Sequence, residues 1–254
     1  MRSRYLEIED RTQDLVETLR QAPALAQEFS RKYELSWIHH ENALEGLIFS
    51  GQEIETALEF QPVAEASSLH AFRDVRNFKA ALDLIRVEAA KKPKVTLALV
   101  RRLYETLHAG IESKAAGEFR REIPLHRAYF HEIAQPAKIE LHIAKLLEWC
   151  DSPDFKATHA IHKASKLQHA FMAVYPYTDG SGKIARLLSN LILVHAGYQP
   201  CIIHTIDRQR YYESLKQPET ALRELMMESM ENGLANGEKF VRQALEARAK
   251  KTAH

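Results

Sequence analysis

The sequence predicts an almost entirely α-helical protein that forms one large domain. Its 254 residues include only nine glycines and nine prolines, which are few for this length. Apolar residues recur mainly at helical intervals, and only one stretch departs from that spacing. A chain of this length can bury a substantial core, and no internal repeat, low-complexity segment or long linker divides it.

The first half of the chain predicts four helices. Their expected bounds are residues 6–29, 33–48, 67–92 and 96–110. The third helix stops before Pro93, because proline cannot continue a helix. Gly110 lies where the fourth helix needs a C-terminal cap.

One stretch, "EFRREIPLHRAYFHEIAQPAK", does not fit a helix. It contains Pro124 and Pro136, and its apolar and polar residues roughly alternate. Alternation of this kind is typical of a strand with one buried face, and proline is tolerated only at sheet edges. We therefore interpret residues 120–133 as a short β-hairpin or extended flap.

The second half returns to helical spacing. Helices are expected at residues 138–150, 156–174, 183–197, 208–216 and 238–254, the last with a frayed basic tail. In the helix at 183–197, one stripe is apolar, while Lys183, Arg186 and Asn190 fall together on another face. That polar face begins at a glycine-containing turn.

The overall composition excludes several classes of partner. The 35 basic and 34 acidic residues nearly cancel, so no overall field favours DNA or an anionic membrane. Cys150 and Cys201 have no metal-type or redox-type spacing, which fits a reducing compartment. The start of the chain is charged, and no apolar run approaches the roughly 20 residues that span a bilayer. We expect a soluble, cytoplasmic protein without a DNA or membrane partner.

The turn at residues 175–186, "YPYTDGSGKIAR", has the composition of an anion site. Gly180 and Gly182 can adopt positive φ, so neighbouring backbone N–H groups can converge on an anion. A helix that starts near Lys183 adds unpaired N–H donors and a positive dipole end. Lys183 and Arg186 flank the same point, which predicts a phosphate site.

Asp179 beside such a site is a candidate Mg²⁺ ligand, because that ion is commonly held by one or two carboxylates together with substrate phosphates. An ordinary helix cap explains the same local pattern, since Asp, Ser and Gly are common before helices. A Walker A loop is excluded, because Tyr177 replaces its first glycine and Ile184 replaces its Ser or Thr.

A family resemblance favours the phosphate site over the simple cap. Residues 175–186 resemble the Fic (Fido) family signature, H-x-F-x-D/E-G-N-G-R-x-x-R. Further similar blocks follow in the same order, including "DVRNFKAALDLI", "GEFRREIPLHRAYFHEIAQPAKI" and "GYQPCIIHTIDRQRYYESL", so the resemblance covers roughly residues 35–216. It implies a Fic fold, with a helical core and a short β-hairpin flap.

A second element resembles the N-terminal inhibitory helix of many Fic proteins. That helix usually carries S/T-x-x-x-E-G/N, and "HHENALEGL" matches its last two positions with Glu45 and Gly46. Glu41 stands where Ser or Thr is usual. The resemblance divides the chain into an N-terminal helix (1–30), an inhibitory-helix-like segment (31–50), a Fic core (51–235, flap 120–133) and a C-terminal helix with a basic tail (236–254).

The resemblance also implies roles for individual residues. Fic proteins typically transfer AMP from ATP to a Ser, Thr or Tyr hydroxyl of a protein that docks on the flap. The implied ligands are Mg²⁺ with ATP or another nucleotide. Asp179 would hold the metal, Arg186 would bind the terminal phosphate, and Glu45 with Gly46 would be inhibitory. The implied nucleotide and phosphate site consists of Gly180, Ser181, Gly182, Lys183, Arg186, Asn190 and Tyr211.

The chain departs from the family signature at Tyr175, Tyr177, Ser181 and Lys183. Tyr175 is the serious departure, because it replaces the histidine that acts as general base in the family. An unshifted imidazole accepts a proton at pH 7, whereas only about one unshifted Tyr in a thousand is ionised there. General base catalysis contributes about 10²–10⁴-fold in rate, so its loss could leave a bound but nearly inert nucleotide.

Three functional hypotheses follow. The first is a nucleotide-binding protein of the adenylyltransferase lineage in which AMP transfer is weak, lost or redirected, with Tyr175, Asp179 and Arg186 at the reaction centre. The second is a non-catalytic interaction module on the same scaffold. The third is a hydrolase that removes AMP and uses Glu45 to orient water, since a carboxylate is a competent base at pH 7.

Overall fold

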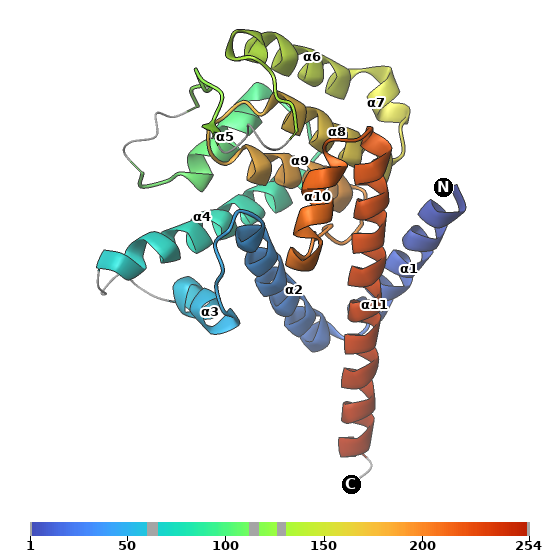
Figure 1. Ribbon diagram of the computed structural model, residues 1–254. Helices are drawn as coiled ribbons and strands as arrows, with labels where there is room; N and C mark the ends of the chain where they lie inside the picture. Colours follow the sequence, from blue (N-terminus) through green and yellow to red (C-terminus); the bar gives the residue numbers. More distant parts are fainter. Residues whose placement is uncertain (1, 60–65, 112–116, 126–130, 253–254) are drawn as a thin grey trace.

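A computed structural model describes residues 2–59, 66–111, 117–125 and 131–252 of the chain, and these residues contain helices but no strand (Figure 1). The predicted all-α class is therefore confirmed. The α-helices are α1 (Arg2–Arg20), α2 (Pro23–Leu44), α3 (Gly51–Glu59), α4 (Ala66–Ala89), α5 (Leu97–Leu107), α6 (Ile139–Asp151), α7 (Pro153–Ala157), α8 (Ala160–Val174), α9 (Ser181–His195), α10 (Arg208–Ser214) and α11 (Glu219–Thr252). Two short 3₁₀ turns, η2 (Pro136–Lys138) and η3 (Thr205–Asp207), precede α6 and α10.

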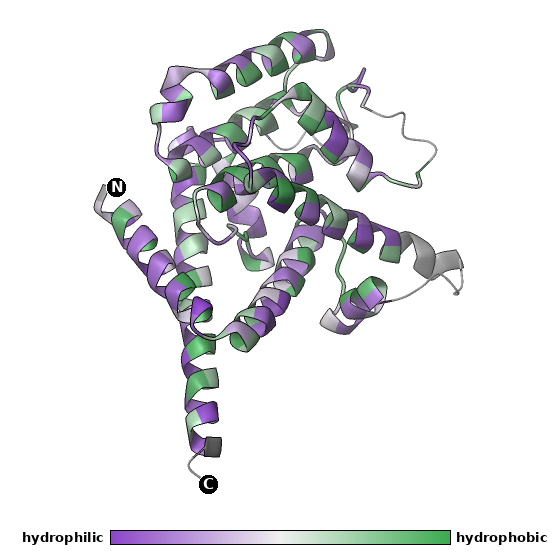
Figure 2. Ribbon diagram, turned by 180° about the vertical axis from the view of Figure 1, so that it is seen from behind, coloured by the Kyte–Doolittle hydropathy of each residue, from purple (hydrophilic) through white to green (hydrophobic). Residues whose placement is uncertain are grey.

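Helices α8 and α9 form the centre of the molecule. They pack against each other, α4 packs on α9, and α11 packs on both α8 and α1 (Figure 1). The apolar stripe predicted for α9 is buried, with Ile184, Leu187, Leu188 and Leu191 at most 1% exposed. Hydrophobic turns gather in these central helices (Figure 2). The fold therefore holds the turn at 175–180 between its two most buried helices. None of the described helices is both long and apolar enough to cross a membrane.

Several helix boundaries differ from the prediction. The first two helices break at residues 21–22, rather than near residue 30, because Pro23 starts α2. Proline suits a first helical turn, where its missing N–H is not needed. The short helices α3 and α7 were not predicted, and the segment predicted to start a helix at 238 is the continuation of α11.

The predicted β-hairpin at 120–133 is not found in the part of the flap that the structure describes; residues 126–130 lie outside it. In the described residues, backbone N–H groups on the two sides of the segment donate to the end of α8 and to the turn after it. The Arg120 N–H donates to the Pro176 carbonyl at 2.9 Å, and the Ala134 N–H donates to the Ala173 carbonyl at 2.9 Å. Alternating polarity predicts an extended chain, but it does not reveal which backbone will satisfy its donors.

Arg120 fixes this segment to the core. Its buried guanidinium donates to the carbonyls of Tyr175 (2.7 Å), Glu122 (3.0 Å) and Val174 (3.3 Å), and also to that of Ala134. One side chain thus satisfies carbonyls at the C-terminal end of α8, where the helix itself leaves them unpaired.

His40 on α2 joins this helix to the turn before α10. Its Nδ1 accepts from the Thr205 N–H at 3.3 Å, and its ring stacks on that of His204 with centroids 4.3 Å apart. Burial, together with the rings of His204 and His39, lowers the pKa of His40 to about 4. The neutral ring is therefore part of the folded state.

We expect this contact to make stability depend on pH. The unfolded chain protonates His40 below about pH 6.5, while the folded protein does so only near pH 4. The unfolded state then binds more protons, so stability falls as pH is lowered through this window. The melting temperature of His40→Gln should fall less steeply between pH 6.5 and 4 than that of the wild type. The same change at exposed His142 should leave the slope as in wild type, and equal slopes for all three proteins would contradict the assignment.

Candidate functional site

The turn begins with an unusual backbone at Tyr175. This residue ends α8 in the left-handed region (φ 47°, ψ 64°), which is uncommon for a bulky side chain. Its N–H donates to the Phe171 carbonyl at 2.8 Å, and its own carbonyl accepts from Arg120. Tyr175 is only 3% exposed. Helix α8 and the flap segment therefore hold this position from both sides.

Ser181 closes the turn from the inside. Its hydroxyl lies 2.8 Å from both the N–H and the carbonyl oxygen of Tyr177, donating to the carbonyl and accepting from the N–H. The ring of Tyr177 is buried and stacks on Tyr104, with centroids 4.2 Å apart. Ser181 thus shapes the loop through its side chain, and α9 starts at that same residue.

Neighbouring side chains pack closely on both glycines. Gly180 has φ +79°, and a Cβ there would lie 2.8 Å from the His108 ring. A Cβ on Gly182 would lie 2.6 Å from Oε1 of Glu45 and 3.1 Å from Nη1 of Arg186. The Glu45 carboxylate therefore rests directly on the backbone of the first turn of α9. This is the place where unpaired N–H groups and the helix dipole favour an anion.

The C-terminal end of α2 places Glu45 beside the first turn of α9. Glu45 is the C-terminal cap of α2, and Gly46 follows it with φ +91°. The N–H of Gly46 donates to Ala43 and the N–H of Leu47 to Asn42, which together form a Schellman motif. Gly46 therefore has a structural reason to be glycine, because it ends the helix just beyond the carboxylate.

Residues of α10 hold the same helix end. Nε of Arg208 donates to the Leu44 carbonyl at 2.9 Å, and the Tyr212 hydroxyl donates to it at 3.2 Å. These contacts tie the last turn of α2 to a helix far along the chain. The site is therefore assembled from α2, α9 and α10.

Arg186, one turn into α9, is the centre of the polar cluster. Its Nη2 donates to Glu45 at 2.5 Å, its Nε donates to Glu41 at 2.6 Å, and its Nη1 donates to the Tyr211 hydroxyl at 3.2 Å. The side chains of Arg186 and Glu41 are each 4% exposed, while that of Glu45 is 24% exposed. From the sequence, Glu41 was interpreted only as a mismatch to the family motif. In the structure it is a direct partner of Arg186.

The cluster shifts the titration of its members. Burial opposes the charged form of Arg186, but Glu41, Tyr211 and Glu45 outweigh it and raise the arginine pKa. Burial also raises the pKa of Glu41, against the lowering effect of Arg186. For Lys183, burial lowers the pKa although Glu45 and Glu41 oppose it. Lys183 donates to Oδ1 of Asn42 at 2.9 Å, so it too faces α2.

A polar cavity of about 300 Å³ adjoins this cluster. Its lining includes Glu45, His108, Asp179, Gly180 and Lys183. The exposed Asp179 carboxylate thus lies at the same cavity as the first turn of α9. The described residues contain no group of three metal-ligating side chains. One carboxylate ligand would be enough for Mg²⁺, because that ion usually takes its remaining ligands from water and phosphate oxygens.

The geometry agrees with comparisons to known proteins. Residues 94–193 match the family model described as Fic/DOC. Residues 94–193 form a Fic domain. The chain is 24% identical over 215 residues to "Protein adenylyltransferase Fic" of Drosophila erecta, covering 84% of this chain and 43% of that protein. The Drosophila virilis protein of the same name is 23% identical over 209 residues, covering 82% and 42%. The Fic chain thus spans less than half the length of these curated relatives.

Solved Fic structures share the fold. A Fic domain containing signaling protein from Bacteroides thetaiotaomicron superposes with a TM-score of 0.78 at 20% identity, covering 92% of this chain and 97% of that one. Fic-1 from C. elegans superposes with a TM-score of 0.77 at 21% identity, covering 94% and 71%. The predicted Fic fold is therefore confirmed.

Asn190 of this Fic domain faces away from the anion position. Its Nδ2 donates to the Cys201 carbonyl at 3.1 Å, and its Oδ1 accepts from the Cys201 N–H at 2.7 Å. Both atoms of the amide are thus engaged with the backbone that follows α9. The remaining residues predicted for the phosphate site lie together at the start of α9, and Tyr211 reaches it through Arg186.

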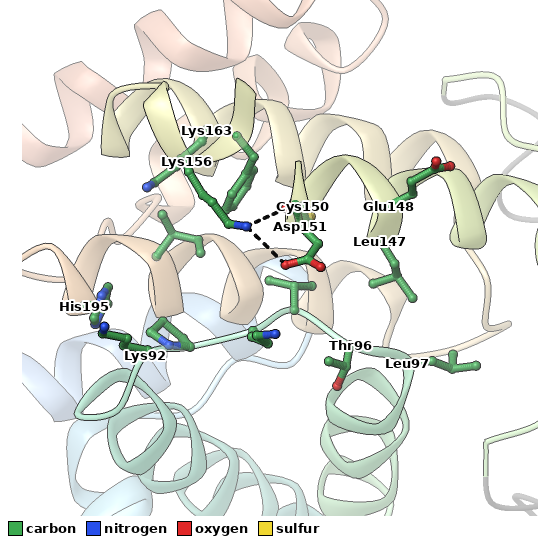
Figure 3. Close-up of a pocket in the computed structure, with 15 residues that line it drawn as sticks. Lys92, Thr96, Leu97, Leu147, Glu148, Cys150, Asp151, Lys156, Lys163 and His195 are labelled. Atoms are coloured by element: carbon green, nitrogen blue, oxygen red, sulfur yellow. Dashed lines mark hydrogen bonds and ion pairs between the residues drawn. The ribbon is translucent and has the colours of Figure 1, made fainter. Parts of the chain in front are cut away.

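A second, larger cavity of about 650 Å³ lies elsewhere in the Fic domain, between α6, α7 and the C-terminal half of α9 (Figure 3). Apolar residues such as Leu97, Leu147 and Ile192 line it, and lysines stand at its edge. Lys156 there donates to the Asp151 carbonyl at 2.8 Å. None of the signature residues reaches this cavity, so we place the candidate site at the smaller one.

Gly182 offers a direct test of where the Glu45 carboxylate lies. We expect Gly182→Ala to destabilise the protein, because the added methyl would lie 2.6 Å from Oε1 of Glu45. In a Glu45→Gly background the same change should cost less, or even stabilise α9, since alanine favours helix by up to about 1 kcal/mol over glycine. Thermal unfolding of the four proteins measures this coupling, and an equal cost of Gly182→Ala in both backgrounds would contradict the contact.

Proposed function

We propose that this chain is a nucleotide-binding protein of the adenylyltransferase lineage, which takes a nucleoside triphosphate such as ATP at the start of α9. One observation carries the proposal. The Glu45 carboxylate lies on the backbone of Gly182 and pairs with Arg186, so an internal anion occupies the position suited to a phosphate group. The curated relatives are named adenylyltransferases, which supports the same lineage.

The residues around this position suit a triphosphate chain. Backbone N–H groups at Gly180–Gly182 and the dipole of α9 favour negative charge. Arg186 would bind the terminal phosphate once its carboxylate partners are displaced, and Lys183 adds a second cation at the cavity. Asp179 would hold Mg²⁺, which would neutralise part of the phosphate charge. Tyr211 orients Arg186 through its hydroxyl.

We further propose that AMP transfer to protein hydroxyls is weak, lost or redirected. Tyr175 replaces the family base and is buried at 3% exposure, so it does not offer an ordinary proton acceptor to an incoming hydroxyl. A target segment would approach along the flap, whose described residues Arg120 fixes beside Tyr175. We find no comparable observation for the interaction module, and in the hydrolase hypothesis Glu45 would have to orient water, whereas here it pairs with Arg186.

Calorimetric titration tests nucleotide binding. The protein is a variant with Glu41→Ser and Glu45→Gly, so that Arg186 is released, and the ligands are ATP, ADP and CTP with and without Mg²⁺. We expect ATP to bind more tightly with Mg²⁺ than without it, and Asp179→Ala in the same background to remove that difference. If no nucleotide binds to the folded variant, the proposal is wrong and the interaction module is favoured.

A further inference from the structure

Glu41 and Glu45 lie one helical turn apart on α2 and contact different parts of Arg186. Oε1 of Glu41 lies 2.6 Å from Nε and also 2.6 Å from Nη2, so it takes the Nε–Nη2 edge of the guanidinium. Glu45 contacts Nη2 from the side of the anion position. One of the two guanidinium edges that can make a two-pronged contact with phosphate is therefore already occupied by Glu41.

The two carboxylates differ in how easily they can leave. Glu45 is the terminal cap of α2, is 24% exposed, and is followed by Gly46 outside the helix. Glu41 is one full turn inside the helix and 4% exposed. Arg208 and Tyr212 hold the last turn of α2 by hydrogen bonds to the Leu44 carbonyl. A change of rotamer can release the partly exposed Glu45 side chain while the last turn stays in place, whereas release of the buried Glu41 requires movement of α2 itself.

We propose that Glu41 is a second inhibitory carboxylate, which keeps Arg186 neutralised after Glu45 has left the phosphate position. The inference rests on the proposed function. Glu45 competes with a phosphate for the first turn of α9, while Glu41 places a fixed negative charge beside any phosphate that replaces it. Removal of each carboxylate makes the charge of the site one unit more positive. Removal of Glu45 alone therefore opens the phosphate position, but the negative charge of Glu41 still offsets the positive charge of Arg186.

Affinity for ATP with Mg²⁺ tests this division of roles. Calorimetry would compare wild type, Glu41→Ser, Glu45→Gly and the double variant. We expect the double variant to bind ATP at least roughly tenfold more tightly than Glu45→Gly, because two like charges a few ångströms apart in a buried site repel strongly. Glu41→Ser alone should bind as weakly as the wild type, since Glu45 still occupies the position. AMP, which lacks the terminal phosphates, should not discriminate between Glu45→Gly and the double variant.

The outcomes separate this inference from the function on which it rests. If Glu45→Gly binds ATP as tightly as the double variant or more tightly, Glu41 positions Arg186 instead of inhibiting it, and the proposed function stands. If the folded double variant binds no nucleotide, the proposed function fails as well. Glu41→Gln in the Glu45→Gly background guards against misfolding, because it keeps the volume and an acceptor while removing the charge. It should reproduce most of the gain in ATP affinity.

Discussion

Replacing Arg186 by methionine should destabilise the protein by about 3–5 kcal/mol, the usual effect of removing one partner from a buried ion pair. Glu41 would remain at 4% exposure without its cation. For a chain of this size each kcal/mol lowers the melting temperature by roughly 2–4 °C, so a loss of roughly 6–20 °C is expected. Thermal unfolding followed by circular dichroism measures it.

The chain offers a matched control for this change. Arg210 pairs with Glu228 at 2.7 Å, but its side chain is 58% exposed. Arg210→Met should cost at most about 1 kcal/mol, because exposed pairs contribute little. Adding Glu41→Gln and Glu45→Gln to Arg186→Met should recover most of the lost stability. An Arg186→Met effect no larger than that of Arg210→Met would contradict a buried cluster.

The stability lost in the same variant should depend on pH. Burial raises the pKa of Glu41 even with Arg186 present, and loss of that cation removes its main opposing effect. The folded state of Arg186→Met would then bind a proton at Glu41 above the pH at which the unfolded chain does. Its stability deficit relative to wild type should therefore shrink as pH is lowered towards 5, and grow as pH rises.

Tyr175→His should give the largest change in catalysis. With Glu41→Ser and Glu45→Gly in place to open the site, we expect transfer of AMP to protein hydroxyls to rise by about 10²–10⁴-fold, the usual contribution of a general base. Histidine is among the residues enriched in the left-handed backbone region, so it suits the φ of 47° found at this position. The Tyr175 N–H and carbonyl make their hydrogen bonds with Phe171 and the Arg120 side chain through backbone atoms of residue 175, so these bonds should persist.

Labelling with ATP that carries a label on its α-phosphate measures this transfer, either to candidate proteins or to the chain itself. The rate of the histidine variant should rise with pH through about 6.5, as its imidazole becomes neutral. Tyr175→Phe is the matched control, because it keeps the ring and removes the hydroxyl. Equal labelling by the Tyr, Phe and His proteins would show that position 175 does not supply the base.

Much of the fold could be predicted because helical spacing is a local property of the sequence. The stripe on α9 is an example, since Ile184, Leu187, Leu188 and Leu191 are all buried as their spacing indicated. The flap could not be predicted in the same way. In its described part, the N–H groups of Arg120 and Ala134 donate to the turn after α8 and to α8, and the Arg120 side chain donates to the Ala134 carbonyl. Alternating polarity does not encode such contacts between separate parts of the chain.

The part of the candidate site that could be predicted is the part in which glycines and charged residues lie in one short segment of the sequence. Gly180, Gly182 and Arg186 lie together in the sequence and in space. Glu41 was missed, because a carboxylate in place of Ser or Thr has no meaning until α2 is seen to lie against Arg186. Its spacing of four residues from Glu45 was the available signal, since residues at i and i+4 share one helical face.

A structure of the Glu41→Ser, Glu45→Gly variant crystallised with ATP and Mg²⁺ tests most directly whether α2 closes a phosphate site at the start of α9. The predicted result places the terminal phosphate within hydrogen-bond distance of the Arg186 guanidinium, with phosphate oxygens at the N–H groups of Gly180–Gly182 and the metal at Asp179. A nucleotide found instead in the cavity edged by Lys92 and Lys156, or density for none in crystals grown with saturating ATP, would contradict it.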